Sequence, residues 1–424
     1  MAMSSVTALP AAPVDEAHRI QTLDVLRGFA VLGILLLNIW SFALPQFAYS
    51  KPNAMGELTG ADYWAWFFTY LLGDYKFVTL FSLLFGAGVM LMTGRAEAAG
   101  RDAGALHRRR MFWLGVIGAL HGYLIWHGDI LFIYAVCGFV IFFIRDWPVR
   151  HLYLAGLLLI AGGSAIAAAQ SGFIASWSDQ RLDEFIAAAG GSPETFRDEI
   201  ENFRSGWLTQ MRERVPLALR IELSVIGTEA GPRTVGVMVL GMALMRSGFL
   251  AGQAPAAIYA ALSLAGFALG LPLVYSGIAA GEARGWDVYA LYGLSHQFNY
   301  WGSLFVAAGW MGLVLMICRA GRLQAVQRRL GAVGRMALTN YLMQSVLATL
   351  IFYGHGLGMF ARLGRAELLL VVLGIWAVQL VWSEPWLRYF RFGPVEWLWR
   401  GLTYERVQPF RRRQKARPAP GPPL

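Results

Sequence analysis

The sequence predicts an all-α fold: a polytopic integral membrane bundle of about ten transmembrane helices with an amphipathic helical extracytoplasmic insertion. Of the 424 residues, 57% are hydrophobic and only 15% are charged, whereas soluble domains carry about a quarter charged residues. Apolar runs recur along the whole chain, so a soluble enzyme with a single anchor is excluded. The arginines gather in alternate connections between these runs, as the positive-inside rule requires of a polytopic protein.

A membrane-spanning helix needs about 20 mostly apolar residues. Ten segments meet this need: 24–44, 62–93, 111–127, 130–145, 149–170, 232–247, 256–279, 299–318, 336–354 and 366–384. The second segment is too long for one straight crossing. Its LLGDYKF stretch, with Asp74 and Lys76, indicates a break, a tilt or a re-entrant half. We count it as one crossing because the arginine pattern then fits.

The arginines also predict the orientation. With the amino terminus in the cytoplasm, the even-numbered connections face inward, and they include Arg108–Arg110 and the arginine-rich stretch 319–335. Both termini are therefore expected in the cytoplasm. The first apolar run is followed by further spans and no small-residue cleavage site, which indicates a retained helix rather than a signal peptide.

Five regions follow from this reading. Residues 1–18 form a disordered cytoplasmic tail, 19–170 an N-terminal transmembrane half, 171–231 the extracytoplasmic insertion, 232–404 a C-terminal transmembrane half with an interfacial helix, and 405–424 a basic cytoplasmic tail. In the insertion, Ser192 is a helix cap and Pro193 the first helical residue; one or two amphipathic helices are expected. They either lie as a cap on the membrane surface or bind substrate. In the interfacial helix, Glu396 and Arg400 are spaced to pair.

The net charge and the cysteine content limit which partners, disulfides and metals we expect. The net charge of +10 is explained by topology, so the partner expected is the lipid bilayer and not nucleic acid. The two cysteines, Cys137 and Cys318, lie in apolar segments, and no paired-histidine metal motif occurs. We expect neither a disulfide nor a bound metal.

Polar residues interrupt the first apolar segment. Asp24 and Arg27 are three apart and can pair, and Asn38 follows Arg27 by about three turns on nearly the same face. Ionisable groups within a bilayer are costly and are therefore functional candidates. They form either a structural ion pair or one wall of a polar cavity that receives an anionic ligand from the cytoplasm.

A histidine and a carboxylate flank the turn after the third segment. His121 lies within the segment, and Asp129 follows His127 and Gly128 in the turn. A histidine oriented by a carboxylate can act as a general base. The alternatives are a packing role for His121 and a helix-capping role for Asp129. His127 is expected at the water interface and is set aside.

Two amides share one face of the ninth segment. Asn340 and Gln344 are four apart, so they either hydrogen-bond across neighbouring helices or line the same cavity as Arg27.

Three stretches resemble a known family. RIQTLDVLRGFAVLGILLLNI, RRRMFWLGVIGALHGYLIWHGDILFIYAVCGF and the C-terminal GRMALTNYLMQS with WSEPWLRYFRFGPVEWLWRGLTY are similar to the YeiB-like bacterial inner-membrane proteins, a domain of unknown function. The resemblance covers nearly the whole chain and implies a multi-pass protein of the bacterial cytoplasmic membrane. The Asp24-x-x-Arg27-Gly28 pattern is also distantly similar to the heparan glucosaminide acetyltransferase family, part of a transmembrane acyltransferase superfamily.

That second resemblance implies acyl transfer from cytoplasmic acyl-CoA to an acceptor across the membrane. The acetyltransferases place a catalytic histidine before the second span, where this chain reads KPNAMGELTGADYW without histidine. His121 is then the substitute candidate on physical grounds, with Asp129 orienting it. It would either take a proton from the acceptor or carry the acyl group transiently.

In this hypothesis Arg27 and Arg108–Arg110 attract the phosphates of acyl-CoA, the donor substrate. Asp24 lies in the same site, and Asn38, Asn340 or Gln344 donates to the developing oxyanion. The acceptor is a glycan, a lipid or a small molecule. A small-molecule transporter and a non-catalytic membrane protein are the alternatives, and a homo-oligomer is left open.

Overall fold

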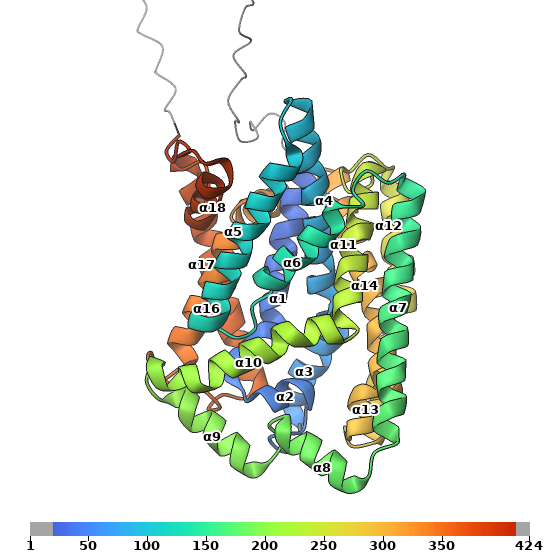
Figure 1. Ribbon diagram of the computed structural model, residues 1–424, viewed down its shortest axis with the longest axis vertical. Coiled ribbons are helices and arrows are strands. Elements are labelled where there is room, and N and C mark those ends of the chain that lie inside the picture. The colour runs from blue at the N-terminus through green and yellow to red at the C-terminus, as the bar shows by residue number, and fades with distance from the viewer. Residues whose placement is uncertain (1–19, 413–424) are drawn as a thin grey trace, which may run out of the picture.

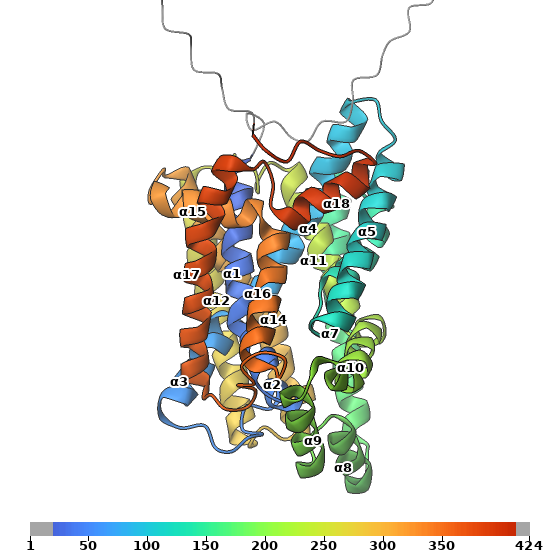
Figure 2. The ribbon, with the colours of Figure 1, turned by 90° about the vertical axis from the view of Figure 1, so that its left-hand side faces the viewer.

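The computed structural model describes residues 20–412 and consists of long helices packed side by side (Figures 1 and 2). Apart from one isolated β-bridge between Phe390 and Arg411, the regular structure of this described part is entirely helical. The predicted all-α membrane bundle is therefore confirmed. Six described segments are both long and apolar enough to cross a membrane: Gln21–Ala43, Gly60–Ala98, Val149–Ala175, Ala256–Ala283, Val288–Arg319 and Arg365–Tyr389.

Each of the ten predicted spans corresponds to a helix or a helix pair. They are α1 (Gln21–Ala43), α3 with α4 (Gly60–Leu72 and Lys76–Ala98), α5 (Ala103–Leu124), α6 (Leu131–Phe142), α7 (Val149–Ala175), α11 (Ala230–Arg246), α12 (Ala256–Ala283), α14 (Leu294–Arg319), α16 (Ala337–Phe352) and α17 (Arg365–Tyr389). Shorter helices complete the chain: α2 (Gln46–Ser50), α13 (Val288–Tyr292) and α15 (Gln324–Arg335).

The second span is broken, which decides between the three alternatives left by its length. Helix α3 ends at Leu72 and α4 begins at Lys76. Between them Tyr75 adopts a left-handed backbone conformation with φ of 63°, which is rare for a bulky residue. Asp74 and Lys76 flank this residue, and both side chains are buried.

Helix α1 occupies the centre of the bundle and packs closely on α15. A Cβ atom at Gly28 would lie 2.0 Å from the Leu330 carbonyl oxygen, and one at Gly334 would lie 1.9 Å from that of Asp24. Small residues at both positions therefore let the two backbones touch, as small residues do elsewhere in membrane helix pairs.

The segment between α7 and α11 contains three helices, α8 (Asp179–Ala188), α9 (Pro193–Arg204) and α10 (Trp207–Gly227), rather than the one or two expected. Helix α7 continues to Ala175, past the predicted boundary at 171. The predicted start of α9 is confirmed: Ser192 Oγ accepts a hydrogen bond from the Thr195 N–H at 3.2 Å. Helices α8 and α9 lie at one end of the bundle, while α10 runs across it (Figure 1).

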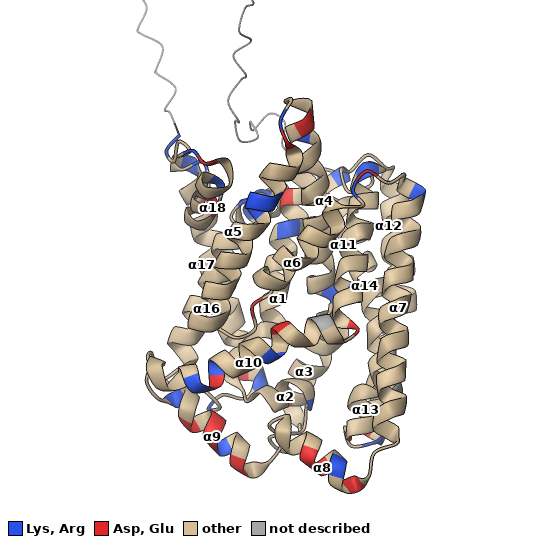
Figure 3. Cartoon of the chain, in the orientation of Figure 1, with Lys and Arg blue, Asp and Glu red and all other residues tan. Residues whose placement is uncertain are grey.

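The described chain begins and ends at the other end of the bundle, where α18 (Pro394–Tyr404) packs beside α5 (Figure 2). Several lysine and arginine residues lie at this end among a few acidic ones, and both signs of charge also occur on α8, α9 and α10 (Figure 3). The predicted tail 1–18 and residues 413–424 of the basic tail lie outside the described residues.

Candidate functional site

A cavity of about 880 Å³ opens among α1, α4, α5, α16 and α18, at the end where the described chain begins and ends. Among the described residues, only two carboxylates line this cavity, those of Asp24 and Glu396. The lining arginines in the same part of the chain number six: Arg27, Arg95, Arg101, Arg110, Arg335 and Arg400. Arginine binds phosphate through paired, charge-assisted hydrogen bonds. The arginine excess therefore makes this mouth a candidate anion site.

Asp24 and Arg27 both line this mouth. The predicted pair is confirmed, because Arg27 Nη1 donates to Asp24 Oδ1 at 3.1 Å. The two side chains remain 14% and 28% exposed, respectively, so they face the cavity and are not sealed between helices. This placement matches the cavity-wall alternative for the first span.

Helix α18 closes one side of the mouth. Arg110 of α5 lies over the Trp399 ring at 4.1 Å, and Trp399 Nε1 donates to the Arg110 carbonyl oxygen at 3.0 Å. Glu396 binds Thr339 instead of forming the predicted pair with Arg400: its Oε2 accepts from Thr339 Oγ1 at 2.5 Å and its Oε1 from the Thr339 N–H at 3.0 Å. Burial raises the pKa of Glu396, and the Thr339 donors oppose that rise. Glu396 thus fastens α18 to the start of α16.

The inner walls of the cavity are apolar. Leu84 and Phe85 of α4, Leu114 of α5 and Leu131 of α6 line them. Tyr341 is the lining residue farthest along α16 from the mouth. The cavity therefore passes from an arginine-rich mouth to an apolar interior that ends beside Tyr341.

His121 and Asp129 form a buried pair across the turn between α5 and α6. The Nδ1 atom of His121 lies 2.7 Å from Asp129 Oδ1, and each side chain is about 1% exposed. Asp129 Oδ2 accepts from the Phe132 N–H at 2.8 Å. Asp129 therefore both orients the histidine and caps the start of α6, two roles that were alternatives in the sequence analysis.

The pair adjoins the cavity without lining it. The His121 ring centroid lies 5.3 Å from that of Tyr341, and Tyr341 itself lines the cavity. The Tyr341 hydroxyl contacts the turn itself, accepting from the Ile130 N–H at 3.3 Å and donating to the Gly128 carbonyl at 3.4 Å. Among the described residues, His121 Nε2 has no hydrogen-bond partner although it is buried.

The predicted amides do not line this cavity. Asn340 Nδ2 donates to the Val333 carbonyl and to Ser383 Oγ, and Asn340 Oδ1 accepts from Trp382 Nε1. Gln344 Nε2 donates to the Val31 carbonyl and to Gln379 Oε1. Of the two alternatives for these amides, the structure therefore has hydrogen bonds across helices. Asn38, the third predicted amide, lies half-buried farther along α1.

His127 corrects another expectation. It is 3% exposed rather than at the water interface, and its Nε2 lies 3.3 Å from both Ser41 Oγ and Gln46 Oε1. Residues of α9 and α10 cover this side of the bundle: the His127 and Phe203 rings lie 6.0 Å apart, and Arg214 donates to the Leu124 carbonyl at 2.8 Å. An apolar-run analysis could not anticipate this cover, because it comes from a segment some 75 residues away in the chain.

Several cavity residues were not predicted as site residues from the sequence. Arg95, Arg101 and Arg335 were interpreted only as topology signals, Arg400 only as a topology signal and a partner of Glu396, and Tyr341 was not singled out. Of the Arg108–Arg110 cluster, only Arg110 lines the cavity, while Arg109 pairs with Glu405.

Known proteins resemble the chain over almost its whole length. Residues 244–406 match the family described as a protein of unknown function, DUF418. The chain is 35% identical to the uncharacterized protein YeiB of Escherichia coli, over 92% of this chain and 97% of the relative. It is 32% identical to the uncharacterized protein YxaH of Bacillus subtilis, over 95% and 98%. With its apolar helical bundle, the chain belongs to the YeiB-like family of bacterial membrane proteins.

Proposed function

We propose that the protein is an acyltransferase that moves an acyl group from cytoplasmic acyl-CoA to an acceptor that is extracytoplasmic or linked to lipid. The observation that carries the proposal is the cavity that leads from six arginines to Tyr341, beside the His121–Asp129 pair. The arginines give this end of the bundle the charge expected of the cytoplasmic face, and we assign the inner membrane and cytoplasmic termini on that basis.

The donor fits the cavity in two parts. Its phosphates carry several negative charges, which arginines such as Arg27, Arg110 and Arg400 would bind at the mouth. Its acyl chain is apolar and would lie between Leu84, Leu114 and other apolar walls. A volume of about 880 Å³ lies within the range of small-molecule sites, about 300–1,000 Å³.

The His121–Asp129 pair supplies the proton transfer. With Nδ1–H donating to Asp129, the lone pair of the imidazole lies on Nε2, the atom that has no partner in the described chain. The acceptor O–H or N–H would lose its proton to Nε2 as its oxygen or nitrogen bonds to the thioester carbonyl carbon. The C–S bond then breaks, and the proton passes from Nε2 to the departing thiolate.

The oxyanion donor proposed from the sequence requires revision. The side-chain N–H groups of Asn340 and Gln344 are already engaged with neighbouring helices. Trp126 Nε1 is buried without a hydrogen-bond partner among the described residues, and the Trp126 ring lies 6.2 Å from that of His121. We therefore propose Trp126 as a further candidate donor to the developing charge, beside Asn38, which stays a prediction from the sequence.

Binding of acyl-CoA to the purified protein tests the proposal. The wild-type chain in lipid nanodiscs should bind a non-hydrolysable acyl-CoA analogue saturably, and binding should weaken as salt rises because arginines hold the phosphates. Absence of binding at low salt would exclude the donor. If binding is found, the acceptor would be sought among glycans, lipids and small molecules of the bacterial envelope by transfer of a labelled acyl group.

Transport of a small molecule is the second candidate function. It is favoured by the break between α3 and α4, where Asp74 and Lys76 are buried within a membrane-spanning helix pair. Uptake of a labelled solute into proteoliposomes without acyl-CoA would favour transport. Acyl transfer by the same preparation with no solute flux would favour the enzyme.

A further inference from the structure

A second, smaller cavity of about 200 Å³ lies toward the opposite end of the bundle and shares no lining residue with the arginine-rich cavity. Helix α1 separates it from the His121 pair. Trp40 of α1 lines the second cavity. Phe42, two residues later, stacks on Trp126 with 4.0 Å between the ring centroids, and Trp126 lies beside His121. An inference from this cavity therefore stands apart from the proposed acyl transfer.

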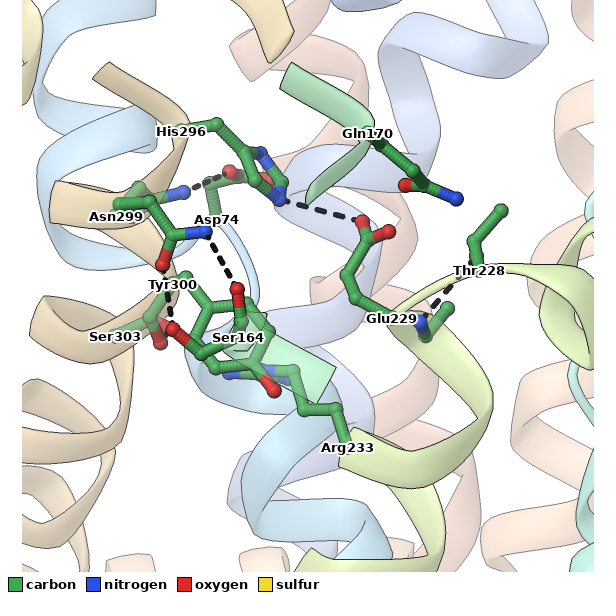
Figure 4. A network of polar contacts seen from close by, with 12 residues as sticks. Asp74, Ser164, Gln170, Thr228, Glu229, Arg233, His296, Asn299, Tyr300 and Ser303 are labelled. Carbon is green, nitrogen blue, oxygen red and sulfur yellow. Dashed lines mark hydrogen bonds and ion pairs between the residues drawn. The ribbon is translucent and has the colours of Figure 1, made fainter. Parts of the chain in front are cut away.

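Hydrogen-bonding groups from separate helices meet in this cavity. Asp74 Oδ2 accepts from Asn299 Nδ2 at 2.6 Å, and His296 Nε2 lies 3.3 Å from Glu229 Oε1. Figure 4 shows His296 turned toward Glu229, with Gln170 on the neighbouring helix. Carboxylate, imidazole and amide groups thus surround one small space, and each retains hydrogen-bonding capacity for a ligand.

The charges around the cavity compensate one another. No lysine or arginine is among its described lining residues, but three cations lie behind them. Arg365 lies 4.7 Å from the Trp40 ring centroid and interacts with the Asp62 carboxylate. Lys76 donates to Asn299 Oδ1 at 2.8 Å, and Arg233 lies 5.0 Å from the Tyr75 ring centroid. These two cations offset the carboxylates of Asp74 and Glu229, so the site favours a neutral ligand over an ion.

The remaining lining residues are largely aromatic, and two of these residues have strained backbone conformations. Tyr75 and Trp286 have left-handed backbones, with φ of 63° and 57°. Bulky residues rarely adopt this region, and such strain tends to persist where a ligand site needs it. Trp40 lines the same space, and its Nε1 is buried without a hydrogen-bond partner in the described chain.

We propose that this cavity binds a small neutral polyol of single-ring size. The flat faces of Trp40, Tyr75 and Trp286 would contact the C–H faces of the ring, and the carboxylate, amide and imidazole groups would bond its hydroxyls. The volume lies below the usual range for drug-sized ligands, about 300–1,000 Å³. A site lined by polar groups rejects a ligand without hydroxyls, because those groups would remain unpaired.

Tryptophan fluorescence of the full-length protein in nanodiscs tests the proposal, because three tryptophans, Trp40, Trp66 and Trp286, line the cavity. The probe is myo-inositol, a neutral cyclic hexol, titrated without acyl-CoA. Saturable binding is expected, with cyclohexanol, a ring with one hydroxyl, binding at least about tenfold more weakly. No saturable response to myo-inositol, or equal binding of cyclohexanol, would overturn the proposal.

Variants identify the cavity as the site. Glu229→Gln should weaken myo-inositol binding by about tenfold or more, since it removes a charged acceptor, and Gln170→Trp should abolish binding by filling the space. Glu282→Gln is the matched control: Glu282 also has a hydrogen-bonding partner, Tyr63, but lies outside the cavity. If Glu229→Gln does not fold, Gln170→Trp decides. Unchanged binding by Gln170→Trp would place the ligand elsewhere and refute the assignment.

Discussion

His121 Nδ1 lies 2.7 Å from Asp129 Oδ1 across the turn that joins α5 and α6, and both side chains are buried. The opposite ring nitrogen, Nε2, has no partner among the described residues. An imidazole held by a carboxylate on one side and without a hydrogen-bond partner on the other is the arrangement of a general base. Its neighbour Tyr341 lines the arginine-rich cavity, so one aromatic side chain separates the pair from that cavity.

Donor binding should depend on the arginines that line the mouth. Arg400→Gln removes a cation from the cavity, and loss of one charge-assisted bond to phosphate should weaken binding of the acyl-CoA analogue by about tenfold or more. Arg109→Gln is the control, since Arg109 pairs with Glu405 and does not line the cavity. Titration at low salt compares the two dissociation constants. An equal loss in both variants would indicate a general charge effect and not a site.

The stability of the protein should fall as pH rises through about 7 because of Glu199. Burial raises the pKa of this α9 carboxyl from 4.5 to about 7, although the Gln46 N–H bonded to it opposes the rise. The folded chain therefore keeps a proton that the unfolded chain releases, so the stabilisation is full below pH 4.5 and is lost as pH rises to about 7. The loss amounts to about 3 kcal/mol.

Glu199→Gln retains the acceptor for Gln46 and removes the titration. Its thermal midpoint should exceed that of the wild type at pH 8 and differ from it much less near pH 5. Glu184→Gln, an exposed glutamate on α8, should follow the wild type at both values. A wild-type midpoint that rises between pH 5 and pH 8 relative to Glu199→Gln would show that the sign is wrong.

Close packing of α1 on α15 should make Gly334 intolerant of a side chain. A Cβ atom there would lie 1.9 Å from the Asp24 carbonyl oxygen, so Gly334→Ala must push the two helices apart. Overpacking of this kind costs about 1–3 kcal/mol, and a lower thermal midpoint in detergent is expected. Gly374→Ala in α17 meets no atom within 4 Å and should leave the midpoint unchanged or raise it.

Cysteine labelling tests the proposed orientation. In a background with Cys137 and Cys318 replaced by serine, Ser192→Cys at the start of α9 should react with an impermeant maleimide in intact spheroplasts. Ala98→Cys, at the opposite end of the bundle in the last residue of α4, should react only after the membrane is opened. The reverse pattern would place the arginine-rich cavity outside the cell.

Helix positions could be predicted from the sequence because a membrane span leaves a strong local signal, about 20 apolar residues, and the arginines report its direction. The pairing of Asp24 with Arg27 and the cap at Ser192 were also predictable, since each depends on residues three positions apart or fewer. His121 and Asp129 lie eight apart, on either side of a turn, so only their chemistry suggested the contact.

The rest depends on helix contacts that periodicity does not encode. Asn340 and Gln344 were correctly expected to share a face, but that face turns toward α17 and α1 and not toward the cavity. The burial of His127 beneath α9 and α10 and the meeting of Asp74 with Asn299 join segments far apart in the chain. A single sequence carries no local signal for such contacts.

Acyl transfer by His121→Gln tests the central claim most directly. Wild-type protein in proteoliposomes, given labelled acyl-CoA and an envelope extract, should label an acceptor. His121→Gln should bind the donor analogue as the wild type does and keep its thermal midpoint, yet transfer should fall by about 10²–10⁴-fold, the usual contribution of a positioned base. Transfer by His121→Gln at the wild-type rate would contradict the account and remove His121 from the mechanism.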